Sequence, residues 1–187
     1  MSQIILVRHS ESLIEPERPA HEWTLTALGL HRCDQLSQEV LQYNPRRVVS
    51  SPEPKAYLTG EAISKNLRIG IETQEDLKEQ LRYTAPYYDS IEEFEAQIKG
   101  IFDHPSEVKF GEETADSVYA RMDRVIEESM YVPQTTVFVT HGTAMSIYVA
   151  RKTHLSAYTF WKNLGLPAYI VMDYPEFRII DLVNRLD

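Results

Sequence analysis

The sequence predicts an α/β protein whose mostly parallel sheet is flanked by helices. The run from Ile4 to Val7 is rich in β-branched residues and too short for a free-standing helix, which is typical of a strand buried on both faces. A second strand-like run spans residues 135–140. Between these two runs, a strand pattern followed by a helix pattern occurs twice. This alternation indicates parallel strands joined by crossover helices.

The segment after the first strand predicts a loop and then a helix. Residues 11–23 lack periodicity and contain two prolines, so they should form a loop that folds over the end of the first strand. A helix should follow Thr26 as its N-cap and run to about Gln42, before Asn44-Pro45 breaks it. Its predicted apolar face comprises Leu28, His31, Cys33, Leu36, Val40 and Leu41.

The middle of the chain begins with regular elements and then loses its periodicity. Residues 46–50 predict a second strand, and residues 54–65 predict a second helix with Lys55 in its first turn. A short third strand is expected at residues 68–72. The region around residues 80–112 reads as an irregular insertion, with one helix from about Ile91 to Lys99 capped by Ser90 and Glu93.

The last third of the chain again follows clear patterns. Residues 114–130 predict a helix with one apolar face, and the strand at 135–140 leads into a further helix that begins near Thr143. Two closing runs, residues 168–172 and 177–182, predict a hairpin at a sheet edge. With no repeat or linker in sight, residues 1–187 are expected to form one domain.

Composition excludes several classes of partner. The formal net charge is -9 and no block of lysine or arginine is present, which argues against binding to nucleic acid or to an anionic membrane surface. No apolar run approaches the ~20 residues of a membrane span, and Met1-Ser2-Gln3 leads straight into the first strand without a signal-peptide pattern. Cys33 is the single cysteine, so a reducing, cytoplasmic location is expected.

Two strand-like runs end at histidines. Arg8-His9 follows the first run, and His141-Gly142 follows the run at residues 135–140. Ligands of open α/β sheets lie beyond the carboxyl ends of the strands, so these side chains are expected to share a site. A histidine after a strand is by itself more often a capping or hydrogen-bonding residue. The functional interpretation rests on both histidines together with the motifs that accompany them.

The ordered motifs of the chain resemble the histidine phosphatase superfamily, the phosphoglycerate mutase-like group. The resemblance covers about the first 150 residues and implies a three-layer α/β/α sandwich of the phosphoglycerate mutase type. The motifs, in order, are Arg8-His9-Ser10-Glu11, Leu25-Thr26-Ala27-Leu28-Gly29, Ser50-Ser51-Pro52 with Lys55 and Thr59, Leu77-Lys78-Glu79, Glu113-Thr114 with Arg121, and Thr140-His141-Gly142.

The resemblance also implies catalytic roles. His9 would form a phosphohistidine intermediate, and His141 would donate to the same phosphoryl group. Glu79 is the candidate proton donor to the leaving oxygen and the base that activates water, although a solvated acidic face would explain its segment as well. A donor of this kind is expected to have a raised pKa.

The phosphate-binding residues implied by the resemblance depart from the family pattern at two positions. Arg8, Ser51 and Gly142 fit that pattern, whereas Ser10 stands where glycine is commonest. Lys55 takes the place of the second phosphate-binding arginine and supplies a point charge in place of a bidentate fork. An ordinary exposed lysine in the first turn of a helix remains an alternative interpretation of Lys55.

Hydrolysis of a phosphomonoester is the favoured activity, on a phosphorylated small molecule or a phosphoprotein. A mutase would need a longer and more basic insertion than residues 80–112 provide, and a noncatalytic phospho-ligand binder is the alternative from another class. The histidine spacing requires no metal, and no cofactor is predicted. The rings of Tyr83, Tyr87, Tyr88 and Phe94 would either contact an apolar part of the substrate or pack the insertion onto the core.

Overall fold

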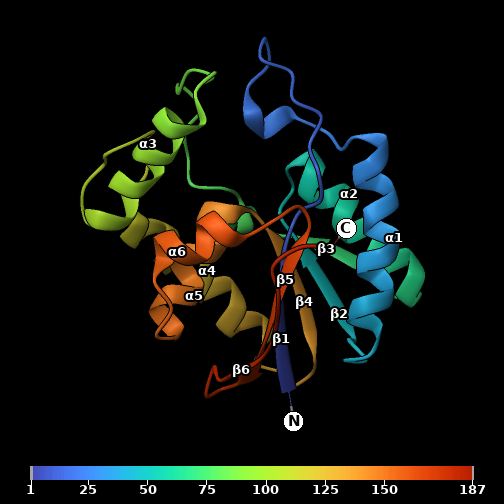
Figure 1. Cartoon of the computed structure of the whole chain (residues 1–187). Coiled ribbons are helices and arrows are strands. Elements are labelled where there is room, and N and C mark those ends of the chain that lie inside the picture. Colours follow the sequence, from blue (N-terminus) through green and yellow to red (C-terminus); the bar gives the residue numbers. More distant parts are fainter. Residues whose placement is uncertain (1, 187) are drawn as a thin grey trace.

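A six-stranded sheet forms the centre of the protein in the computed structural model, which describes residues 2–186 (Figure 1). The strand order is β3-β2-β4-β1-β5-β6. The strands are β1 Ser2–Arg8, β2 Arg47–Ser50, β3 Ile71–Thr73, β4 Thr136–Thr140, β5 Ala168–Tyr174 and β6 Ile179–Val183. The first four are parallel to one another, and β5 and β6 form an antiparallel hairpin at one edge. The predicted mostly parallel sheet is confirmed.

Helices cover both faces of this sheet, which confirms the three-layer sandwich (Figure 1). One layer holds α1 Ala27–Leu41 and α2 Pro54–Leu67. The other layer holds α3 Ile91–Asp103, α4 Ala115–Ser129, α5 Gly142–Lys152 and α6 Ala157–Asn163. Two short 3-10 helices, η1 Ala20–Glu22 and η2 Glu75–Leu77, lie in the loops.

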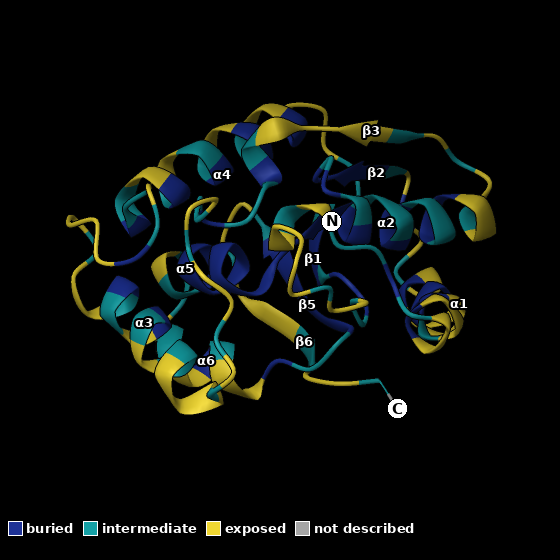
Figure 2. Ribbon diagram, turned by 90° about the horizontal axis from the view of Figure 1, so that it is seen from above, coloured by how far each residue is buried: buried dark blue, intermediate teal, exposed yellow. Residues whose placement is uncertain are grey.

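Strand β1 supplies side chains to the cores of both layers. Ile4 and Leu6 pack in the cluster that includes residues of α4 and α5, whereas Ile5 and Val7 pack in the cluster that includes residues of α1 and α2. This alternation follows from the two-residue period of a strand. Figure 2 shows the central strands buried and β6 exposed at the edge. An uninterrupted aliphatic run is what such a doubly covered strand requires.

The predicted helix starts are confirmed at three caps. The side chains of Thr26, Ser90 and Thr114 each accept a hydrogen bond from the backbone N–H three residues further on, at the starts of α1, α3 and α4. The third strand lies later than predicted, at Ile71–Thr73, because Arg68 ends α2 in a left-handed conformation with φ 56. Helix α6 was not predicted, since its seven residues are too few for a clear period.

The predicted apolar face of α1 is partly wrong. Cys33, Leu36 and Val40 are buried as expected, but His31 is exposed and Leu28 and Leu41 are 47% and 48% exposed. Gly29 and Ser37 complete the buried stripe, and Gly29 permits the close approach of α1 to the backbone of Glu11. The helix therefore buries a narrower stripe than its hydrophobic residues indicate.

Substitution of Gly29 by alanine should destabilise the protein. A Cβ at this position would lie 2.3 Å from the carbonyl oxygen of Glu11, so the backbone must move. We expect Gly29→Ala to lower the free energy of unfolding in urea by about 1–3 kcal/mol. Gly70→Ala is the matched control, because a Cβ added at Gly70 would meet no atom within 4 Å, and it should change stability by less than about 0.5 kcal/mol. Equal effects of the two substitutions would contradict the close approach of Glu11.

Candidate active site

The pairing of β1 with β4 brings the two predicted histidines together. The strands are parallel, with Arg8 opposite Thr140, so the carboxyl ends of β1 and β4 lie at the same end of the sheet. The backbone N–H of His9 donates to the carbonyl of Thr140 at 3.1 Å. The ring centroids of His9 and His141 are 5.1 Å apart, with an interplanar angle of 62°. Residues far apart in the sequence therefore form one histidine pair.

A backbone carbonyl fixes the tautomer of His9. Its Nδ1 lies 2.8 Å from the carbonyl oxygen of Ser10, which only accepts, so Nδ1 carries the proton and Nε2 keeps its lone pair. Burial, followed by the neighbouring His141, Lys55 and Arg8, holds the pKa of His9 well below its usual range. The ring is therefore neutral at neutral pH, as a nucleophile must be.

His141 is fully buried and contacts a predicted phosphate-binding serine. Its Nε2 lies 2.9 Å from Oγ of Ser51. Its Nδ1 has no hydrogen-bond partner among the residues that the structure describes. Burial and the charge of Lys55 lower the pKa of His141, although Glu79 acts in the opposite direction. This second imidazole is also neutral and has a free ring nitrogen.

The guanidinium of Arg8 lies against the start of α5. Its Nη1 donates to the carbonyl of Leu164 at 2.5 Å, and a Cβ on Gly142 would lie 3.0 Å from its Cζ. Gly142 therefore makes room for the arginine. Burial lowers the pKa of Arg8 to about 10, with Glu79 opposing that change, so the group stays cationic at neutral pH.

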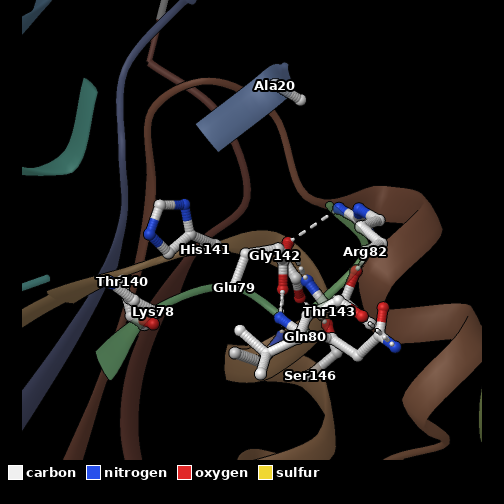
Figure 3. Close-up of polar contacts among 12 residues, drawn as sticks. Ala20, Lys78, Glu79, Gln80, Arg82, Thr140, His141, Gly142, Thr143 and Ser146 are labelled. Atoms are coloured by element: carbon white, nitrogen blue, oxygen red, sulfur yellow. Dashed lines mark hydrogen bonds and ion pairs between the residues drawn. The ribbon is translucent and has the colours of Figure 1, made fainter. Parts of the chain in front are cut away.

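The carboxylate of Glu79 caps the first turn of α5 (Figure 3). It accepts hydrogen bonds from the backbone N–H groups of Thr143 and Ala144 at 3.1 and 2.9 Å. Gln80 N–H and Arg82 Nη2 donate to the same carboxylate at 2.9 and 3.2 Å. A helix N-terminus and a guanidinium together stabilise the ionised form of this group.

The prediction that the pKa of Glu79 is raised is wrong for the protein without a bound substrate. Burial by itself raises that pKa, but the charge of Arg82, the neighbouring His141 and the backbone donors together outweigh it. The resulting pKa of Glu79 is about 2. The solvated acidic face that was the alternative for Glu79 is also wrong, because only 13% of its side chain is exposed.

Arg121 fixes the loop that carries Glu79. It donates to both carboxylate oxygens of Glu113, at 2.8 and 3.0 Å. The same guanidinium donates to the backbone carbonyls of Asp76 and Lys78, at 2.6 and 2.8 Å, and to that of Glu79, at 3.0 Å. One guanidinium fork therefore orders the backbone of η2 and of the residues that follow it.

Lys55 is a buried member of the site, so its interpretation as an ordinary exposed lysine is wrong. The residue is 6% exposed, and its Nζ donates to the carbonyl of Ala20 in η1 at 2.5 Å. Its Nζ also lies 3.1 Å from Oε2 of Glu53. Oε1 of Glu53 accepts the backbone N–H of Glu79 at 3.1 Å and lies 3.7 Å from Nε2 of His141. These contacts connect the ends of β2 and β4.

Ser10 differs from the other predicted phosphate-binding residues, because its hydroxyl is used within the fold. The hydroxyl donates to the carbonyl of Gly29 at 2.8 Å, and the backbone N–H donates to Oγ1 of Thr59 at 3.0 Å. The carbonyl of Ser10 is the part that faces His9. Ser10 therefore positions the ring of His9, and its hydroxyl donates its proton to the backbone of α1.

Two residues of the site were not predicted from the sequence. Glu53 lies between two prolines in a stretch that reads as a turn, and Arg82 lies in the segment without periodicity. The guanidinium of Arg82 stacks over the rings of Phe94 and Phe110, at 5.5 and 5.9 Å from their centroids, while it contacts Glu79. One hint of the role of Glu53 was present in the sequence, namely its position two residues before Lys55, a predicted phosphate-binding residue.

The aromatic residues of the insertion divide into two groups. Tyr88 and Phe94 pack with Phe110 on the core, as the packing interpretation predicts. Tyr83 and Tyr87 are each 45% exposed. The ring of Tyr83 contacts His21 in η1, and the ring of Tyr87 contacts Trp23 directly after η1, with centroids 4.5 and 6.3 Å apart. We call these four residues, His21, Trp23, Tyr83 and Tyr87, the aromatic rim.

The described part of the chain contains neither a metal cluster nor a membrane-spanning helix. Among residues 2–186, no group of three histidine, cysteine, aspartate or glutamate side chains is arranged to hold a metal ion. Within that same range, no helix combines the length and the apolar character needed to cross a membrane.

A mostly parallel sheet that brings two neutral histidines and an arginine together at the carboxyl ends of β1 and β4 defines an α/β protein with a histidine-centred candidate site. The model of the family described as the histidine phosphatase superfamily (branch 1) matches residues 4–177. The chain belongs to this superfamily, so the predicted family is confirmed. Membership supports a phosphoric monoester hydrolase that works through a histidine.

Solved structures with the same fold include two phosphatases. The mycobacterial glucosyl-3-phosphoglycerate phosphatase is 16% identical, has a TM-score of 0.78, and aligns over 100% of both chains. The phosphoserine phosphatase of Entamoeba histolytica is 16% identical, has a TM-score of 0.72, and aligns over 99% of this chain and 98% of its own. Among curated proteins, none matches the sequence. The structural likeness confirms the phosphoglycerate mutase-like fold.

The low pKa of Glu79 predicts a pH-dependent contribution to stability. A carboxylate with a depressed folded-state pKa stabilises the fold fully above its unfolded pKa of 4.5, and this contribution is lost as the pH falls towards about 2. Glutamine would turn an amide N–H₂ towards backbone donors. We expect Glu79→Gln to lower the free energy of unfolding by about 3 kcal/mol at pH 7, and by progressively less below pH 4.5. Urea titrations of both proteins at several pH values test this expectation, and a difference that does not depend on pH would contradict it.

Proposed function

We propose that this protein hydrolyses a phosphomonoester through a phosphohistidine intermediate on His9. The observation that carries the proposal is the fixed tautomer of His9, whose Nδ1 is bound to the Ser10 carbonyl while the depressed pKa keeps Nε2 unprotonated. Such a ring attacks phosphorus with Nε2 and accepts no proton in doing so. Membership of the histidine phosphatase superfamily supports this chemistry.

The cations and donors around His9 suit a phosphoryl group. Arg8 would grip the phosphoryl oxygens with its planar fork, and Lys55 would add a point charge. His141 and the hydroxyl of Ser51 would donate to the same oxygens, which carry the charge of the transition state. Gly142 contributes by leaving space for Arg8. Most of these groups are buried, where water weakens their attraction for the phosphoryl group least.

Glu79 would handle the protons of both half-reactions. In the first, Nε2 of His9 bonds to phosphorus, the ester P–O bond breaks, and the leaving oxygen takes a proton from Glu79. In the second, the Glu79 carboxylate takes a proton from water, whose oxygen attacks the phosphohistidine and releases phosphate and neutral His9. A phosphate dianion beside Glu79 raises the pKa of that carboxyl, which favours its protonation in the complex.

A phosphorylated small molecule is the substrate class that we propose. The nucleophile is only 7% exposed, and η1, which carries His21 of the aromatic rim, contacts Lys55 of the site through the carbonyl of Ala20. Such a buried nucleophile favours a small substrate over a phosphoprotein. The two structurally similar phosphatases are described as acting on glucosyl-3-phosphoglycerate and phosphoserine. The rim would contact the leaving group.

The proposal extends to the organisation and location of the chain. The family match over residues 4–177 supports one histidine phosphatase domain in residues 1–187, with residues 80–112 as its insertion. The single cysteine, Cys33, is buried and fits a reducing compartment, which supports a cytoplasmic location.

Removal of the nucleophile should abolish hydrolysis. We expect His9→Ala to lower kcat/KM for p-nitrophenyl phosphate by at least about a thousandfold, because the ring nitrogen that would bond to phosphorus is removed. The wild-type protein should acquire an acid-labile ³²P label from a ³²P-labelled substrate, and His9→Ala should not. His31→Ala is the matched control, since this histidine is exposed on α1. Equal turnover by the wild type and His9→Ala would remove the phosphohistidine mechanism, and absence of turnover by the wild type would favour the noncatalytic alternative.

The role of Glu79 predicts a dependence on the leaving group. A general acid matters most when the leaving oxygen is strongly basic. We expect Glu79→Gln to lower kcat/KM for an alkyl phosphate by about 10²–10⁴-fold, and for p-nitrophenyl phosphate by much less. The assay is run at a temperature at which the variant is folded by circular dichroism. Losses of the same size for both substrates would show that Glu79 acts on the fold of the site and not on the leaving group.

A further inference from the structure

A carboxylate that the proposed mechanism does not use lies inside the site. Glu53 is 5% exposed, and it lies in the turn between β2 and α2. Its Oε2 pairs with Nζ of Lys55 at 3.1 Å, and the side chain of that lysine is 7% exposed. Its Oε1 contacts the N–H of Glu79 at 3.1 Å and approaches His141 Nε2 to 3.7 Å. An anion therefore already sits beside two groups proposed to bind phosphate.

This carboxylate reduces the positive charge available to a phosphoryl group. Arg8, Lys55 and Arg82 contribute three cations, and Glu53 and Glu79 contribute two anions while both histidines are neutral. The ammonium of Lys55 is held between Glu53 and the carbonyl of Ala20, and both oxygens compete with a phosphoryl oxygen for it. Without Glu53, the full charge of Lys55 would act on the ligand.

We propose that Glu53 is an affinity-setting residue that weakens the binding of phosphate, so that the product leaves a buried site. The inference rests on the proposed phosphatase function. Inorganic phosphate has the same oxygens and charge as the phosphoryl group of the substrate, so every cation that binds one also retains the other. An internal anion paired with Lys55 lowers the affinity for both, and the transition state keeps its contacts with Arg8 and His141.

Glu53→Gln separates the charge of this residue from its hydrogen bond. Glutamine can keep an oxygen at the Oε1 position, where it accepts the N–H of Glu79. Its amide nitrogen would then face Nζ of Lys55, and two donors do not pair. Lys55 is thereby released towards the ligand. A purely structural role of Glu53 predicts weaker phosphate binding in this variant, whereas the affinity-setting role predicts tighter binding.

The direct test is a calorimetric titration of each purified full-length protein with inorganic phosphate. We expect the Kd of Glu53→Gln for phosphate to be about tenfold lower than that of the wild type. This factor is the effect expected when one nearby charge is removed from a partly screened site. Product inhibition of p-nitrophenyl phosphate hydrolysis by phosphate should strengthen by the same factor. The matched control is Glu61→Gln on α2, whose carboxylate pairs with Lys65 at 2.8 Å and is 33% exposed. Its Kd should equal that of the wild type.

Glu53→Gln leaves Lys55 as an unpaired buried cation, which destabilises the fold. If this variant does not fold, a comparison of Lys55→Met with the double variant still tests the proposal. Lys55→Met leaves Glu53 as an uncompensated anion and should weaken phosphate binding by more than about tenfold. The double variant Glu53→Gln with Lys55→Met removes both charges and should recover most of that loss. Phosphate binding by the double variant as weak as by Lys55→Met would overturn the proposal.

The outcomes separate this inference from the proposed function. Phosphate binding by the wild type with an equal or higher Kd for Glu53→Gln overturns the affinity-setting role and leaves the phosphatase function standing. Binding by Glu53→Gln but not by the wild type supports the role in its strongest form. No binding by either protein, with both folded, overturns the phosphate site itself and this inference with it.

Discussion

The parallel pairing of β1 with β4 is the constraint on which the site depends. Val7 lies opposite Val139 and Arg8 opposite Thr140, so both strands end at the same level and release His9 and His141 side by side. A slip of one residue would turn the aliphatic side chains of β1 to the wrong layers, because alternate residues serve different cores. Burial of the core on both faces therefore fixes the geometry of the two histidines.

Local patterns account for most of the predictable fold. The aliphatic runs of β1 and β4 and the capping residue Thr26 carry their information within a few neighbouring positions, and the structure has those elements where they were expected. The burial of Gly29 in place of Leu28 depends on the backbone of Glu11, which comes from another segment of the chain. Such contacts have no signature in a local window of sequence.

The same distinction applies to the site. His9 and His141 could be found because each ends a recognisable strand. Glu53 and Arg82 could not, because their surroundings come from other segments: Glu53 is enclosed by Lys55 and the Glu79 loop, and Arg82 rests on rings of the insertion. A glutamate between prolines is usually solvated, and only the tertiary fold makes this one a buried counterion.

Burial opposes charge on every group at the site, yet the histidines and Glu79 respond differently. The cations that repel a proton from His9 and His141 attract the carboxylate of Glu79, which also receives the N–H donors of α5. At rest, the proposed nucleophile His9 is unprotonated at Nε2, and the proposed acid Glu79 is ionised. In the proposed mechanism, the proton for the leaving oxygen can come from two sources. It arrives on a phosphomonoester monoanion, whose second pKa is about 6, or Glu79 takes it up from solvent as the dianion enters. The arrangement that activates His9 therefore makes catalysis depend on the protonation state of the substrate complex.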